Sequence, residues 1–164
     1  MFGNAFIVIY VVIVIYLSCK YRKKKEKEKK WDLIMGYYFM WCIGFPTLTA
    51  FIIHAFYPGY IAEYIGWPKS PFQMEVALFN LAIGITSVRA CFSKIGYRWA
   101  VALIYFIYAL GVGINHIFYL LGKNDFTLTQ FHPIFYSDII DIITSLVIII
   151  LMTIYHQIHR KKHI

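Results

Sequence analysis

The chain has 164 residues, of which 60% are hydrophobic, 20% aromatic and only 15% charged, and its formal net charge is +8. A soluble domain is about 45–50% apolar and about 25% charged, so this composition excludes an ordinary soluble protein, and the length allows one domain at most. Half of the 16 basic residues lie in the run Lys20–Lys30, directly after an apolar segment. That position indicates contact with anionic lipid and no role in binding nucleic acid.

Five apolar runs are long enough to cross about 30 Å of hydrocarbon, which takes roughly 20 residues. The first lacks a basic start and a cleavage site, so it is interpreted as an uncleaved anchor. The sequence therefore predicts an all-α integral membrane protein with five transmembrane helices. An anchor helix with a basic linker occupies residues 1–32, a four-helix bundle core 33–155 and a basic tail 156–164. The spans are predicted at Phe2–Cys19, Leu33–Phe56, Met74–Phe92, Trp99–Leu121 and Asp138–Tyr155.

The charges also predict how the chain lies in the membrane. With the N-terminus outside, only Lys69 and Lys123 of the 16 basic residues fall outside. Because positive residues are enriched on the cytoplasmic side, we expect a multi-pass protein of the cell membrane with a cytoplasmic C-terminus. The basic residues inside then include those of a short turn around Lys94–Arg98. The expected environment is the lipid bilayer, with anionic lipids at Lys20–Lys30.

Prolines and loops give weaker signals. A kink is expected at Pro46 in the second span. Pro58-Gly59 and Trp67-Pro68 suggest a turn-rich outer cap, and His132-Pro133 falls in the second outer loop. Cys19, Cys42 and Cys91 have no spacing that predicts a disulfide framework or a redox motif.

Polar residues within the predicted spans are the main functional signal. An ionisable group inside a span costs roughly 2.5–3.5 kcal/mol on insertion scales, so such groups are candidate functional residues. Four spans bring polar groups to one level just below the outer surface, whereas the inner halves hold no charged side chain except Arg89. The candidates are His54, Gln73, Glu75, Asn80, Asn115, His116, Asp138 and Asp141.

Helical spacing predicts which of these groups face protein. His116 shares a face with Gly113 and Ala109, where small residues let helices approach closely. Two other stripes are polar or small enough to face protein. Asp138, Asp141 and Ser145 form one in the fifth span, and Gln73, Asn80, Gly84 and Ser87 form one in the third. A competing third-span stripe holds Glu75, Ala82 and Thr86.

Several interpretations of this polar level remain open. It is a buried hydrogen-bond network in which Glu75 is neutral or paired with His116 and the aspartates cap the fifth span. Alternatively, Glu75, His116 and Asp138 hold a metal ion, or His54 and His116 hold a haem. A cavity for a quinone, a lipid or another small molecule is a further reading. A proton path is disfavoured because the inner halves offer no continuation.

Six short motifs stand out in spans two to five: Trp67-Pro68, Ser70-Pro71-Phe72-Gln73, Glu75-Val76-Ala77, Asn80-Leu81-Ala82, His116-Ile117 and Asp138-Ile139-Ile140. With these motifs the chain resembles, over roughly residues 35–155, a family of small prokaryotic membrane proteins known only as a domain of unknown function, distantly similar to the DoxX-like four-helix group. The resemblance implies a four-helix core in which Glu75, His116 and Asp138 face each other, and it implies no activity. Where the family tends to have glycine and proline, this chain has Asn115 and Asp141.

The sequence thus predicts a membrane protein of unknown activity with a polar site near the outer face of a helix bundle. The site is expected to bind a small molecule or cofactor, or the protein to act as a subunit of a larger membrane complex or as a homo-oligomer. A small oxidoreductase using haem or quinone is the competing class, by fold-level analogy alone. A purely structural or assembly protein is the third, and the balance leans away from an enzyme.

Overall fold

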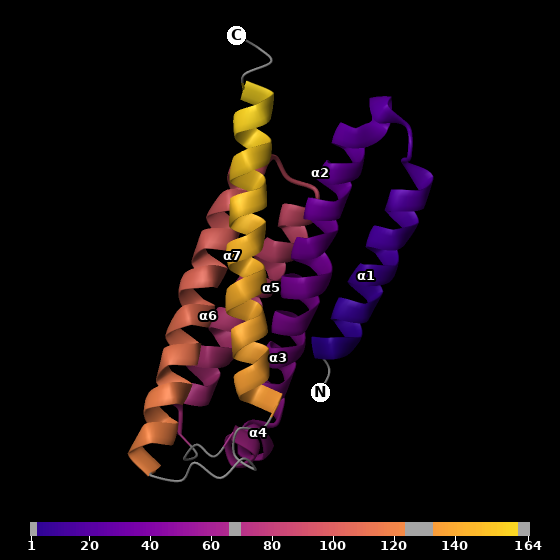
Figure 1. Ribbon diagram of the computed structural model, residues 1–164. Helices are drawn as coiled ribbons and strands as arrows, with labels where there is room; N and C mark the ends of the chain where they lie inside the picture. The colour runs from indigo at the N-terminus through magenta and orange to yellow at the C-terminus, as the bar shows by residue number, and fades with distance from the viewer. Residues whose placement is uncertain (1–2, 66–69, 124–132, 161–164) are drawn as a thin grey trace. The chain divides into compact units, whose positions relative to one another are not determined.

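The computed structural model describes residues 3–65, 70–123 and 133–160, and it divides the chain into two compact units (Figure 1). Unit 1 is Met1–Lys94 and unit 2 is Ile95–Ile164. The described residues form helices and turns and contain no strand. Four helical stretches are long and apolar enough to cross a membrane, and a shorter apolar helix precedes them. The predicted all-α membrane fold is therefore confirmed, whereas a crossing by the first helix stays a prediction.

Unit 1 is built on one long apolar helix, which runs from Lys27 to Phe56 and is followed by a short helix and a second long one. Its elements are α1 (Gly3–Lys20), the 3₁₀ turn η1 (Lys24–Glu26), α2 (Lys27–Tyr38), the π-helix η2 (Phe39–Gly44), α3 (Phe45–Phe56), α4 (Pro58–Ile65) and α5 (Phe72–Cys91). The short helix α4 occupies part of the segment that was expected to form a turn-rich outer cap. Proline is favoured as the first residue of a helix because its missing N–H is not needed there. Trp67 and Pro68 lie outside the described residues.

The irregularity expected at Pro46 takes the form of a π-helical stretch directly before it. Pro46 falls in the first turn of α3, just after η2 ends at Gly44. Proline has no N–H and its ring crowds the carbonyl four residues earlier, so a regular α-helix is unfavourable at that point. A π-helix shifts the backbone pairing to five residues, which is a common way to accommodate such a defect.

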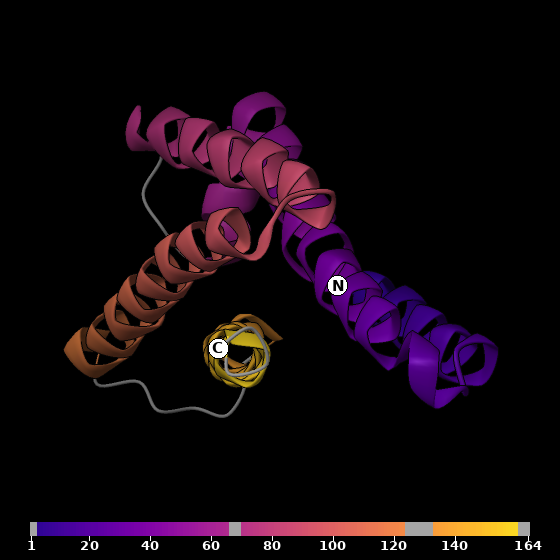
Figure 2. The same ribbon diagram turned by 90° about the horizontal axis from the view of Figure 1, so that it is seen from above.

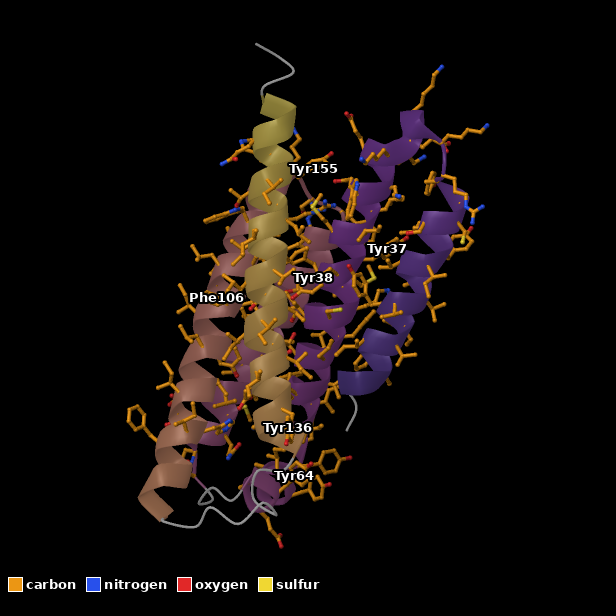
Figure 3. All side chains as sticks on the ribbon, in the orientation of Figure 1. Tyr37, Tyr38, Tyr64, Phe106, Tyr136 and Tyr155 are labelled. Atoms are coloured by element: carbon orange, nitrogen blue, oxygen red, sulfur yellow. The ribbon has the colours of Figure 1, made fainter. Side chains whose placement is uncertain are left out.

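The helix α1 packs along α2 and η2 through aromatic side chains. The Tyr10 hydroxyl donates a hydrogen bond of 3.3 Å to the Ile34 carbonyl. The Phe6 ring lies 6.5 Å from that of Trp41 and 6.1 Å from that of Phe45. Trp41 is the one tryptophan inside a predicted span, and its contact with Phe6 explains why it lies there. Figure 3 shows the neighbouring Tyr38 on α2.

Unit 2 is a helical hairpin of α6 (Ile95–Lys123) and α7 (Pro133–Arg160). Viewed down α7, α6 is inclined to it (Figure 2). Figure 3 shows Tyr136 near the N-terminal end of α7 and Tyr155 towards its C-terminal end.

Both helices of unit 2 begin earlier than the sequence patterns predict. Arg98 lies in the first turn of α6 and is buried, where a cytoplasmic turn was expected. Because α7 begins at Pro133, Asp138 and Asp141 lie well inside the helix and cannot cap its start. Hydropathy locates the apolar centre of a helix, whereas its first residue is set by backbone pairing and capping. His132 lies outside the described residues.

The predicted division into an anchor, a four-helix core and a tail stays a prediction. What the structure shows is a boundary between Lys94 and Ile95, in the short turn that joins α5 to α6.

Candidate functional site

The polar stripe of α5 is the first part of the candidate site and lies inside unit 1. Gln73 and Asn80 are 3% and 4% exposed, and Ser87 is fully buried. On the same face, a Cβ added to Gly84 would lie 2.6 Å from Leu48 Cγ and 3.1 Å from Thr47 Oγ1. Glycine therefore lets α5 approach α3 closely. The stripe of Gln73, Asn80, Gly84 and Ser87 is thus the face that α5 turns towards its own unit.

His54 and Gln73 form a hydrogen-bonded pair across the end of unit 1. The distance from His54 Nδ1 to Gln73 Oε1 is 2.6 Å. His54 lies in the last turn of α3 and Gln73 in the first turn of α5, so the bond joins two helices whose ends are connected through α4. An amide oxygen only accepts, so Nδ1 carries the proton that is donated. In this pair a neutral amide oxygen accepts from the N–H edge of the imidazole ring.

Glu75 does not share this environment. It is exposed, and it follows Gln73 by two residues, which turns it about 200° around the helix. The stripe of Glu75, Ala82 and Thr86 accordingly lies away from the buried face of α5. Asn80 points into unit 1 and donates a hydrogen bond of 2.9 Å to the Val76 carbonyl of its own helix.

His116 and Asp138 form the second pair, inside unit 2. His116 Nδ1 lies 2.6 Å from Asp138 Oδ2. The two side chains are 15% and 11% exposed, so the pair is mostly but not completely buried. One turn before His116, a Cβ on Gly113 would lie 3.7 Å from Asp138 Cβ. The nearer neighbour of that Cβ would be Ile142 Cδ1 at 3.0 Å, so the missing side chain of Gly113 leaves room for Ile142 of α7 beside the pair. Asn115, beside His116 in sequence, is exposed and points off this interface.

One turn deeper, a second polar group lies on the same hairpin face. The Asp141 side chain is hydrogen-bonded by Tyr105, whose own side chain is 4% exposed, and it lies close to Asp138. The Ser145 hydroxyl donates a hydrogen bond of 2.6 Å to the Asp141 backbone carbonyl. The predicted stripe of Asp138, Asp141 and Ser145 therefore faces α6.

Tyr105 is a residue that the sequence analysis missed. It lies four residues before Ala109 on the face that also holds Gly113 and His116, so extending the same spacing by one turn would have found it. A second missed contact lies near the other end of the hairpin, where Trp99 Nε1 donates to Thr153 Oγ1 at 3.2 Å. Trp99 was assigned to the membrane interface, and no pattern indicated its partner.

A carboxylate that holds Nδ1 of a histidine fixes the orientation and the tautomer of the ring. Over the residues that the structure describes, neither unit gathers three or more His, Cys, Asp or Glu side chains close enough to hold a metal ion. The predicted metal set of Glu75, His116 and Asp138 draws on both units, and so does the haem set of His54 and His116. Both therefore stay predictions. What each unit holds by itself is an oriented histidine.

The family of unknown function DUF6790 matches residues 3–161. The chain belongs to this family. The match includes α1, so the first helix is part of the DUF6790 pattern and no addition to it. No curated protein and no solved structure matches the chain.

Proposed function

We propose that this DUF6790 protein is a multi-pass membrane protein whose α6–α7 hairpin binds a small molecule at the His116–Asp138 pair. The observation that carries the proposal is the contact of 2.6 Å between His116 Nδ1 and Asp138 Oδ2 inside a hairpin of two apolar helices. Asp141 and Tyr105, one turn deeper, extend the polar face of the proposed site.

Packing alone does not require these groups. Two apolar helices associate through small residues such as Gly113 and Ala109, whereas ionisable side chains in a membrane helix are costly and are a functional-site hypothesis by default. The pair keeps 15% and 11% of its side-chain surface exposed, so a ligand can reach it. An imidazole and a carboxylate suit the polar head of a quinone or a lipid, whose apolar part would lie in the bilayer.

In the proposed orientation the N-terminus lies outside and the C-terminus in the cytoplasm, which puts the His116–Asp138 end of the hairpin on the outer side. The distribution of basic residues supports this orientation. A reporter enzyme active only in the cytoplasm, fused after residue 164, is expected to be active. An active periplasmic or extracellular reporter at the same place would reverse the orientation.

The binding proposal is tested on protein purified in mild detergent. The visible spectrum, the metal content and the extracted organic molecules, identified by mass spectrometry, are compared between the wild type and Asp138→Asn. We expect the wild type to retain a defined small molecule and the variant to lose it at least about tenfold, because the oriented imidazole loses its charged acceptor. A Soret band would identify the haem alternative, and stoichiometric metal the metal alternative.

A matched control separates binding from folding. Thr153→Val removes the acceptor of the Trp99 hydrogen bond near the opposite end of the same hairpin, so it perturbs α6–α7 packing without touching the pair. This variant is expected to retain the molecule. If wild-type protein carries nothing, or if Asp138→Asn retains as much as Thr153→Val, the pair serves only to hold the hairpin together and the proposal is wrong.

A second candidate function is that of a subunit in a larger membrane complex or a homo-oligomer, which the exposed carboxylate of Glu75 on the apolar helix α5 favours. A charged side chain on such a helix costs less free energy in contact with a protein partner than in contact with lipid tails. Glu75→Gln is then expected to shift the native complex to a smaller mass in detergent, which light scattering measures. A small oxidoreductase stays an alternative function. The distant DoxX-like relationship and the prokaryotic origin that the resemblance implies stay predictions.

A further inference from the structure

The tip between α1 and α2 concentrates positive charge beside aromatic rings. Eight basic and two acidic residues lie between positions 20 and 30. The helix α1 ends at Lys20, the 3₁₀ turn η1 follows, and α2 begins at Lys27, so the two helices carry these residues to one end of unit 1 (Figure 1). This arrangement is independent of the His116–Asp138 pair.

Two lysines from different helices converge on one ring at this tip. Lys20 Nζ, at the end of α1, lies 5.7 Å from the centre of the Tyr21 ring, and Lys29 Nζ, in the first turn of α2, lies 5.5 Å from it. Lys20 also lies 5.3 Å from the Tyr16 ring. The Tyr21 backbone N–H continues α1 by donating to the Leu17 carbonyl at 2.9 Å. Tyr21 is therefore fixed to α1, and a cation–π contact draws Lys29 of the other helix towards it.

We propose that Lys20 and Lys29, which both approach the Tyr21 ring, bind the phosphate of one anionic phospholipid from the cytoplasmic leaflet. Two ammonium groups near one ring repel each other, and a phosphate that contacts both relieves this repulsion while accepting hydrogen bonds from both. The Glu26 side chain makes no capping bond at the start of α2. The positive end of the helix dipole then adds to the attraction for an anion.

The apolar surface beside the tip favours a lipid over a soluble phosphate. Val8, Val12 and Tyr16 are 62%, 60% and 57% exposed. They precede Lys20 at intervals of four residues, so they form a row along α1 that leads to Lys20. Acyl chains attached to a headgroup at Lys20 would cover this face, whereas a soluble phosphate would leave it bare. Tyrosine and tryptophan at the headgroup level, here Tyr21 and Trp31, fit the same placement.

The proposal is tested by native mass spectrometry of the full-length protein, with phosphatidylglycerol and phosphatidylcholine as probes. The double variant K20Q/K29Q removes both charges at Tyr21. The matched control K23Q/K25Q removes two charges from the same basic run, at exposed lysines. We expect the first variant to lose about tenfold in phosphatidylglycerol affinity, and the control to lose about twofold or less.

A second comparison tests the ring. Tyr21→Phe keeps the aromatic face and should bind phosphatidylglycerol as the wild type does. Tyr21→Leu keeps all the charges but removes the cation–π contacts, and it should bind about threefold more weakly.

Three results would overturn the proposal. Equal losses in the two lysine variants would mean that the whole basic run attracts lipid without a defined site. Equal binding of phosphatidylcholine would remove the requirement for an anionic headgroup. Displacement of phosphatidylglycerol by millimolar inorganic phosphate would assign the site to a soluble phosphate. Native mass spectrometry with and without inorganic phosphate distinguishes the last case.

Discussion

Each unit contains a histidine whose Nδ1 contacts a side-chain oxygen on another helix, but the two acceptors differ in charge. In unit 1, Nδ1 of His54 donates a hydrogen bond to Oε1 of Gln73. In unit 2, Nδ1 of His116 lies next to Oδ2 of Asp138. The nitrogen-to-oxygen distance is 2.6 Å in both pairs. In each unit the histidine lies towards the C-terminal end of one helix and its partner in the first part of a following one. The acceptor is a neutral amide in unit 1 and a carboxylate in unit 2.

The surroundings of the two pairs differ as well. In unit 1 the pair is one contact of a close helix interface, where Gly84 lets α5 approach Leu48 and Thr47. In unit 2 a Cβ on Gly113 would lie 3.0 Å from Ile142 Cδ1, the end of a flexible side chain, and 3.7 Å from Asp138 Cβ. An added methyl group therefore has less room at Gly84 in the α3–α5 contact than at Gly113 in the α6–α7 contact. The comparison teaches that two helix contacts can hold a histidine at the same distance from its acceptor while they differ in local packing and in the charge of that acceptor.

Removal of the acceptor is expected to give the largest contrast. Asp138→Ala leaves a mostly buried imidazole without its carboxylate and should lower the free energy of unfolding of unit 2 by about 3 kcal/mol. Gln73→Ala removes a neutral acceptor and should cost unit 1 about 1 kcal/mol. At about 2–4 °C per kcal/mol for a chain of this size, thermal unfolding in detergent resolves the difference.

A thiol-reactive dye can follow each unit separately. The three native cysteines all lie in unit 1, where Cys91 is buried and reacts only after unfolding. For unit 2, Met152→Cys, at a fully buried position, is introduced after the native cysteines have been replaced. If Gln73→Ala costs as much as Asp138→Ala, the charge of the acceptor is not what distinguishes the units.

Filling the two glycine contacts should give the next largest contrast. Gly84→Ala drives a methyl group into Leu48 Cγ, at 2.6 Å, and overpacking of this kind costs about 1–3 kcal/mol. Gly113→Ala meets Ile142 Cδ1 at 3.0 Å, which can move, and Asp138 Cβ at an ordinary contact distance of 3.7 Å, so it should cost less than about 1 kcal/mol. The same unit-specific unfolding curves measure both effects. A larger cost at Gly113 would show that the α6–α7 interface is the more tightly packed one.

Asp138→Asn makes the pair of unit 2 resemble that of unit 1. An amide oxygen can still accept from His116 Nδ1, so only the charge-assisted part of the bond is lost, which is about 1 kcal/mol. The stability of unit 2 should then fall by less than in Asp138→Ala. Equal losses in the two variants would indicate that the asparagine side chain does not keep the bond, which a crystal structure of the variant would reveal.

Gly111→Ala should have the smallest effect and serves as the control for both glycine substitutions. A Cβ at this position meets nothing within 4 Å. Alanine in a helix interior is favoured over glycine by about 0.5–1 kcal/mol, so α6 should keep or slightly gain stability. A loss of stability in Gly111→Ala would indicate a partner on that face of α6. The expected loss of unfolding free energy in Gly113→Ala would then be larger as well.

Periodicity predicted much of the candidate site within each helix. The stripe of Gln73 and Asn80 is buried in unit 1, and the faces that hold His116 and Asp138 both turn towards a neighbouring helix in unit 2, as the spacing of small and polar residues indicated. Tyr105 was missed because the face of Ala109, Gly113 and His116 was not followed one turn further towards the N-terminus. Glu75 was grouped with these residues by depth, but depth along a helix does not tell the direction in which a side chain points.

The sequence by itself determined the helices, the membrane character and the residues that share a face, because these follow from the hydropathy and from the 3.6-residue period of the chain. Only the tertiary structure decided that His54 pairs with Gln73, that Asp138 holds His116 and that Tyr105 bonds Asp141. Partners of this kind depend on how two helices approach each other. That approach is set by packing at single positions such as Gly84 and Gly113, and no periodic pattern encodes it.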